Sequence, residues 1–246
     1  MNEEAVVEFR NVTKAFGERK VLDDVSFKVR AGEALCVLGR SGTGKSTTLK
    51  LLIGLLKPDK GQILIENEDI APFEEEDLSR VRRKIGFMFQ SAALFDSFSL
   101  GDNLALPMQR LNKCKSIDEI DRAVDEALQQ VGLGTDRAKM PSELSGGMRK
   151  RAGLARALVL KPRLLLIDEP SSGLDRITAS EIDDLLLKVK KESQTTMIIV
   201  THDVHGARRV GDQMAVLDRG RLVGFGTADE LQGSDNEVVR NLVSES

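Results

Sequence analysis

The residues whose types and spacing suggest chemistry most directly form the run GRSGTGKS at positions 39–46. This run fits the pattern G-x-x-x-x-G-K-[ST], in which glycines let the backbone curl around an anion and point successive N–H groups at it. Lys45 would reach the β- and γ-phosphates of a nucleoside triphosphate, and Ser46 offers a hydroxyl oxygen of the kind that Mg²⁺ binds. The expected phosphate-binding residues are Gly39, Arg40, Ser41, Gly42, Thr43, Gly44, Lys45, Ser46 and Thr47.

Two adjacent carboxylates, Asp168 and Glu169, follow the apolar run 164–167, which is typical of a central parallel strand. Ligands bind at the carboxyl ends of the strands in open α/β sheets. Because side chains alternate between the faces of a strand, we expect the two acids to have different roles. Asp168 suits the Mg²⁺ side of the site, and Glu169 is placed to orient or deprotonate an attacking water. The next buried strand, 197–201, ends at His202, which we expect to reach the γ-phosphate.

A second anion-binding site is predicted at Ser145, Gly146 and Gly147, just before a helix expected over residues 149–160. The serine can cap the helix, and the glycines leave backbone N–H groups uncovered at the positive end of the helix dipole. The alternative is an ordinary capped helix with no ligand.

Aromatic side chains for stacking on a nucleotide base are scarce, because the chain has no Trp or Tyr and only nine Phe. Phe16 lies in a loop upstream of the phosphate loop and is our candidate for adenine stacking. The alternative is a core phenylalanine between two strands.

The surrounding pattern predicts an α/β fold. The phosphate loop is flanked by a buried strand at 34–38 and an amphipathic helix at 47–56. Residues 5–9 and 25–29 alternate as strands, and 85–89 is a strand that ends at Gln90. Further expected elements are a strand at 62–65, a short helix at 77–83, a helix at 117–131 and a hairpin at 214–225, with capping boxes at Ser116–Glu119, Thr178–Glu181, Thr227–Glu230 and Ser234–Glu237.

We expect the 246 residues to form one domain with an inserted helical part. Residues 1–90 and 161–226 would make the nucleotide-binding α/β core. Residues 91–160 would make a helical subdomain, and 227–246 a helical tail.

Composition excludes several other classes of protein. The net charge of −3 argues against a broad nucleic-acid-binding surface. The acidic start does not resemble a signal peptide, and no apolar run approaches the ~18 residues of a membrane span. The two cysteines, Cys36 and Cys114, support neither a disulfide framework nor a zinc site, and a reducing cytoplasm fits.

Together these motifs resemble those of the ATP-binding-cassette (ABC) ATPases over nearly the whole chain. Gln90 matches the glutamine loop, residues 144–148 match the signature motif LSGGQ, and 164–169 match the Walker B motif with its glutamate. Asp175 matches the end of the D-loop, and His202 matches the switch histidine. The resemblance implies a phosphate-loop NTPase core of RecA type, with an N-terminal antiparallel β subdomain and a helical signature subdomain.

The same resemblance implies the cofactors and the assembly. ATP and Mg²⁺ would bind at the phosphate loop, with Gln90 contributing both to catalysis and to the metal site. The ATPase would work as a head-to-tail homodimer in which Ser145, Gly146, Gly147 and Asp175 act on ATP held by the other copy. An integral membrane permease would place it at the inner face of the cytoplasmic membrane.

One departure from the family pattern points to a subfamily. The fifth signature residue is usually Gln, and here it is Met148. The strings LSGGMRKRAGLARAL and MFQSAALFDS resemble the ATPases of Mce/Mla-type lipid transporters. That resemblance implies phospholipid transport, with an Mce-domain protein and a STAS-domain protein as further partners.

Other functions stay open from the sequence alone. An amino-acid importer is the main rival within transport, and a soluble ABC ATPase of iron–sulfur cluster assembly is the rival outside it. A scaffold that binds ATP without hydrolysing it is a third. We also expect the apolar run 92–106 to form part of a docking groove for a permease helix, against the alternative that it is all local core.

Overall fold

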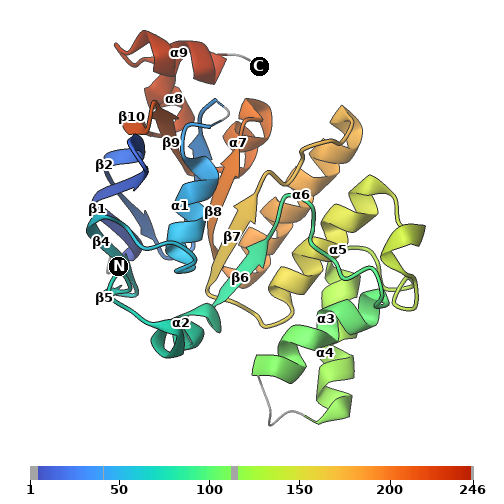
Figure 1. Cartoon of the computed structure of the whole chain (residues 1–246). Helices are drawn as coiled ribbons and strands as arrows, with labels where there is room; N and C mark the ends of the chain where they lie inside the picture. The colour runs from blue at the N-terminus through green and yellow to red at the C-terminus, as the bar shows by residue number, and fades with distance from the viewer. Residues whose placement is uncertain (1–4, 41, 112–115, 245–246) are drawn as a thin grey trace.

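The computed structural model describes residues 5–40, 42–111 and 116–244. Two β-sheets and several helices form its layers, with α1 on one side of strands β7 and β6 and α5 on the other (Figure 1). The predicted α/β class is confirmed. Ser41 of the phosphate loop and Cys114 lie outside the described residues.

The larger sheet is six-stranded, in the order β10-β9-β3-β8-β7-β6. Its pairs are parallel except for the hairpin of β9 and β10, which was predicted. The parallel register places the carboxyl ends of β3, β7 and β8 at one edge, where the predicted site residues follow. The strands are β3 (Ala34–Leu38), β6 (Ile85–Met88), β7 (Leu164–Asp168), β8 (Thr196–Thr201), β9 (Gln213–Asp218) and β10 (Arg221–Gly226).

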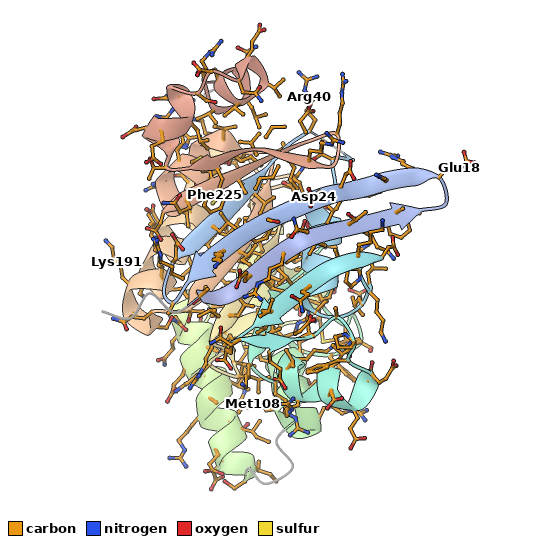
Figure 2. The ribbon with its side chains drawn as sticks, turned by 90° about the vertical axis from the view of Figure 1, so that its left-hand side faces the viewer. Glu18, Asp24, Arg40, Met108, Lys191 and Phe225 are labelled. Carbon is orange, nitrogen blue, oxygen red and sulfur yellow. The ribbon has the colours of Figure 1, made fainter. Side chains whose placement is uncertain are left out.

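The smaller sheet is antiparallel and four-stranded, in the order β2-β1-β4-β5. Its two long strands form a hairpin whose tip, marked by Glu18, projects beyond the rest of the sheet (Figure 2). The expected strands 5–9 and 25–29 are only parts of them. The four strands are β1 (Ala5–Phe16), β2 (Arg19–Arg30), β4 (Lys60–Ile65) and β5 (Glu68–Asp69).

Helices separate and flank the strands. Three of them, α3, α4 and α5, fall between β6 and β7 in the chain, where helices were expected. The helices are α1 (Lys45–Leu52), α2 (Glu75–Arg82), α3 (Leu100–Leu111), α4 (Ile117–Gln130), the 3-10 turn η1 (Pro141–Glu143), α5 (Gly146–Leu158), α6 (Arg176–Ser193), α7 (Val204–Val210), α8 (Ala228–Gln232) and α9 (Glu237–Ser244). Among these described helices, none has the length and apolar character needed to cross a membrane.

The larger sheet is buried on both faces, so alternate residues of each strand enter different cores. In β3, Cys36 packs with the cluster that contains α5 and α6, and Val37 packs with the cluster that contains α1 and the smaller sheet. Cys36 is buried as predicted, and burial raises the pKa of its thiol to about 12.

Two of the four predicted capping boxes are wrong. Helix α6 does not begin after Thr178, because Asp175 caps it by accepting hydrogen bonds from the N–H groups of Ile177 and Thr178. Asn236, instead of Ser234, caps α9, since its side chain accepts from the N–H of Val238 at 3.0 Å. The boxes that begin at Ser116 and Thr227 are confirmed.

Candidate active site

The phosphate loop joins the end of β3 to the start of α1, as predicted. Gly44 caps α1 with φ 107°, a left-handed backbone conformation that favours glycine. A Cβ atom there would lie 2.6 Å from the carbonyl oxygen of Val21, so the close packing of the loop also excludes a side chain. Helix α1 begins at Lys45, two residues before the predicted start, which puts its free N–H groups directly at the loop.

Lys45 lies under the loop and is only 7% exposed. Its Nζ donates to the carbonyl oxygens of Gly39 at 2.7 Å and Arg40 at 3.2 Å, and lies 3.9 Å from a carboxylate oxygen of Glu169. Burial lowers the pKa of this ammonium, and the charges of Glu169 and Asp168 act in the opposite direction. These contacts hold a positive charge at the N-terminus of α1, where it would stabilise a bound anion most.

Ser46 and Asp168 meet across the edge of the sheet. The Ser46 hydroxyl donates to Oδ1 of Asp168 at 3.1 Å. Desolvation raises the pKa of Asp168, the hydrogen bond from Ser46 opposes that shift, and neighbouring Glu169 adds to it. Two hard oxygen donors are therefore paired beside Lys45, in the place that the sequence indicated for a metal ion.

Glu169 follows the last residue of β7, and its side chain bonds to other residues than the side chain of Asp168 does. Its φ is 48°, which ends the strand in a left-handed conformation that is costly for a residue with a side chain. Its N–H donates to the carbonyl of Val200 at 2.9 Å, so β8 helps to hold the turn. The carboxylate is buried and faces the end of β8.

His202 stands at the end of β8, and its ring contacts this carboxylate. Nδ1 lies 2.7 Å from Oε2 of Glu169, and the backbone N–H of His202 donates to the same oxygen at 3.3 Å. The sequence placed both residues at strand ends but did not predict that they pair. An imidazole that orients this carboxylate would fix where the carboxylate meets a water molecule.

The second predicted anion site is a helix N-terminus, although the helix starts at Gly146 and not at Arg149. Ser145 caps α5, with its hydroxyl accepting from the N–H of Met148 at 3.2 Å. Ser145 and Gly146 are exposed. Figure 1 shows α5 and α1 on different sides of β6 and β7, so the two predicted anion sites belong to helices of different layers.

The other predicted site residues lie in the phosphate loop and α1, or at or next to the ends of β1, β6 and α6. Phe16 is 51% exposed at the tip of β1, which contradicts the alternative of a core phenylalanine. Gln90 follows β6 with an exposed side chain, and Asp175 is occupied as the cap of α6. Three loop residues and one helix residue complete the predicted set: Arg40 and Gly42 are exposed, Thr43 is buried and Thr47 is half-buried.

Lys150 is a residue that sequence reasoning missed. It is buried in the second turn of α5, and its Nζ donates to the carbonyls of Gln90 at 2.7 Å and Glu169 at 2.9 Å, and to Ser172 Oγ at 3.1 Å. Nothing in the spacing could reveal it, because two of its acceptors are backbone atoms. It is the fifth residue of a helix that starts at two glycines, and that position alone does not identify its acceptors.

A glycine loop at a helix N-terminus, a buried lysine beneath it and two acids at the adjacent strand ends define a phosphate-loop nucleotide hydrolase. The ABC transporter family profile matches residues 22–172. The chain belongs to the ABC transporter family, and it is an ATP-binding, ATP-hydrolysing cassette.

Known proteins similar to the chain include transport ATPases and solved cassettes. "Probable ribonucleotide transport ATP-binding protein mkl" of Mycobacterium leprae is 47% identical over 97% of the chain, which spans 68% of that relative. "Protein TRIGALACTOSYLDIACYLGLYCEROL 3, chloroplastic" of Arabidopsis thaliana is 39% identical over 99% of the chain and 74% of its own length. The dimeric ATP-binding cassette MJ0796 bound to ADP and Pi superposes with a TM-score of 0.82 and 33% identity, over 90% of this chain and 98% of that one.

Proposed function

We propose that this chain is the ATPase subunit of a transporter that moves phospholipid through a partner membrane permease, at the inner face of the cytoplasmic membrane. The observation that supports the ATPase role best is the cluster of Lys45, Ser46, Asp168 and Glu169 around one edge of the sheet. The assignment of a lipid as substrate is supported by Met148 and the sequence strings around it, and by a relative that is named for a galactolipid.

Mg²⁺ would be held by Ser46, Asp168 and Gln90 together with the ATP phosphates. The two paired oxygens of Ser46 and Asp168 suit this ion, which is bound through few protein ligands and keeps waters. Within the described ranges, no group of three His, Cys, Asp or Glu residues could hold a metal ion, so protein side chains alone do not form a metal site there. The ion would neutralise charge on the β- and γ-phosphates.

We infer that two copies act together, because each copy carries one phosphate loop and one exposed helix N-terminus. The end of α5 at Ser145, Gly146 and Gly147 would close over the γ-phosphate bound at the partner copy's phosphate loop; Ser145 and Gly146 are exposed there, whereas Gly147 is buried beside Thr178, contrary to the expectation that both glycines are uncovered. Asp175 lies at the start of the neighbouring helix α6 and would face the same interface, and Phe16 would stack on the adenine.

Part of the run 92–106 forms a groove between β6, α3 and α5, and this groove is our proposed docking site for a permease helix. Leu100 and Leu104 are fully buried, so that part of the run is core. Phe95 and Phe98 remain exposed, although Asn103 holds their loop rigidly with hydrogen bonds to the backbone of both. A fixed loop that presents two aromatic rings to solvent is suited to bind an apolar partner.

A charge in this groove should uncouple ATP hydrolysis from transport. Phe95 is 50% exposed, so Phe95→Asp should leave the fold intact while it removes the apolar contact with the permease helix. We expect the isolated chain to keep its ATPase rate, and transport by the reconstituted complex to be lost. Phe225→Asp, at a residue of similar exposure on β10, is the control and should keep both. Unchanged transport by the Phe95→Asp complex would show that the permease helix docks at another surface.

Met148 marks the subfamily and is not expected to act on ATP. Its side chain is half-buried against the helical core, and a thioether is a weak hydrogen-bond acceptor. Met148→Gln should therefore keep ATP hydrolysis near the native rate. A steady-state phosphate-release assay checks this, and a large loss would give Met148 a role in the composite site.

Purification of the membrane complex tests the whole proposal. We expect mass spectrometry in nanodiscs to find a permease, an Mce-domain protein and a STAS-domain protein with this chain, and bound phospholipid. ATP should then drive phospholipid transfer between vesicles. A permease that moves amino acids or ribonucleotides, with no Mce-domain subunit, would overturn the lipid assignment. Recovery without any membrane protein would favour the soluble ATPase of cluster assembly, and ATP binding without hydrolysis would favour the scaffold.

A further inference from the structure

Lys150 connects the helix that begins at the signature residues to the loops that carry Gln90 and Glu169. Its ammonium has three protons, and its three acceptors lie in two segments, the one after β6 and the one after β7. One is the carbonyl of Gln90 after β6, one is the carbonyl of Glu169 after β7, and one is the hydroxyl of Ser172 in the following loop. The lysine is 7% exposed, so these bonds do not compete with bulk water.

The bond to the Glu169 carbonyl acts at the point of greatest backbone strain in the site. Glu169 has a φ of 48°, a conformation that costs about 1–3 kcal/mol for a residue other than glycine and persists only when its surroundings hold it. The N–H of Glu169 donates to the carbonyl of Val200, and its own carbonyl accepts from Lys150 at 2.9 Å and from the N–H of Ser172 at 3.3 Å. Both ends of the residue are thus fixed, which sets where its side chain leaves the backbone, and His202 then orients the carboxylate itself.

The positive charge of Lys150 also compensates the negative charges of the acids beside it. Two acids, Asp168 and Glu169, adjoin it, and they favour its charged form while burial disfavours it. A methionine would match its length, but it would remove the lysine donor from both carbonyls and leave the Glu169 carbonyl with only the N–H of Ser172, and the acids with one cation fewer. An arginine keeps the charge and several donors, in a planar arrangement that fits three divergent acceptors less well.

We propose that Lys150 is a positioning residue for ATP hydrolysis: it sets the orientation of Glu169 and makes it depend on the position of α5. This inference rests on the proposed role of Glu169. Movement of α5 that brings its N-terminus onto a nucleotide pulls on the Glu169 carbonyl through the Lys150 ammonium, so hydrolysis is tied to closure of the second anion site. Lys150 does not touch the phosphate loop by any of these bonds, and ATP binding does not depend on it.

The test compares Lys150→Met, Lys150→Arg and a control, Lys191→Met, at an exposed lysine of α6 far from the site (Figure 2). We expect Lys150→Met to lower kcat by roughly 10², the cost of a small misplacement of a reacting group, with the affinity for ATP nearly unchanged. Lys150→Arg should recover much of kcat. Lys191→Met should match the native chain in both.

A double-variant measurement separates positioning from a general structural role. If Lys150 acts through Glu169, adding Lys150→Met to Glu169→Gln should lower the single-turnover rate little further, because residues that act as a unit are not additive. A native kcat in Lys150→Met, or a full additional loss in the double variant, would overturn the inference. If Lys150→Met fails to fold, Lys150→Gln is the substitute: its side chain is polar but uncharged and too short to reach the two carbonyls, so kcat should fall with unchanged affinity, and a native kcat there would also overturn the inference. A native kcat in Glu169→Gln itself would reject the role of Glu169 instead.

Discussion

Replacing Glu169 by Gln should leave ATP bound and stop most of its hydrolysis. The glutamine keeps the size of the side chain and its place at the end of β7, but it cannot accept a proton from water. General-base and water-orienting groups contribute roughly 10²–10⁴ to a rate. His202 lies 2.7 Å from this carboxylate, so the native acid is already oriented for that task. Phosphate release at saturating ATP measures the loss, and a nucleotide-binding assay checks that affinity is kept.

Glu181→Gln is the matched control for this change. Glu181 is an exposed glutamate on α6 and should tolerate the same loss of charge with a native rate. Near-native ATP turnover by Glu169→Gln would contradict the proposed role of Glu169 in activating water, whether or not the variant binds ATP with native affinity.

Replacing Lys45 by Ala should abolish ATP binding at working concentrations. The ammonium is the positive charge nearest to the predicted position of the β- and γ-phosphates, and the carbonyls of Gly39 and Arg40 fix its position. Hydrogen bonds to charged groups contribute about 1.5–3 kcal/mol each, so losing two of them to phosphate lowers affinity by roughly 10²–10⁴. Asp168 and Glu169 would also face the phosphates with less compensating charge. Equilibrium binding of labelled ATP with Mg²⁺ is the measurement.

Lys191→Ala serves as the control for Lys45→Ala, because it removes an exposed lysine at a distance from the loop. Thermal unfolding of both variants should resemble that of the native chain. Tight, Mg²⁺-dependent ATP binding by a folded Lys45→Ala chain would count against the phosphate-loop assignment.

Local patterns were sufficient to predict the strands and loops that carry the site. The motif spacing predicted the junction of β3 and α1, and the alternation of a buried strand predicted that Asp168 and Glu169 face different neighbours. Asp168 does meet Ser46, and Glu169 does not. Motif spacing identified the residues, whereas the contacts join positions 122 and 33 residues apart, which the parallel sheet brings to one edge.

Features that depend on distant backbone atoms were not predictable. The bonds of Lys150 join residues 60 and 19 positions away through carbonyl oxygens, which carry no side-chain signal. The length of β1 was missed because the register with β2 shifts between Phe9 and Val12 and again near Lys14, which breaks the strict alternation. The start of α6 was missed because Asp175 caps it through a local turn that competes with the Thr178 pattern.

The mass of the Glu169→Gln chain in solution with ATP and Mg²⁺ is the most direct measurement of the central claim, that ATP is bound between the phosphate loop of one copy and the α5 end of another. Light scattering should give the mass of two 27.0 kDa chains with ATP and of one without it. Adding Ser145→Arg, which places a bulky side chain at the exposed cap of α5, should return the mass to one chain while ATP stays bound. A single-chain mass for Glu169→Gln at saturating bound ATP would contradict the shared site.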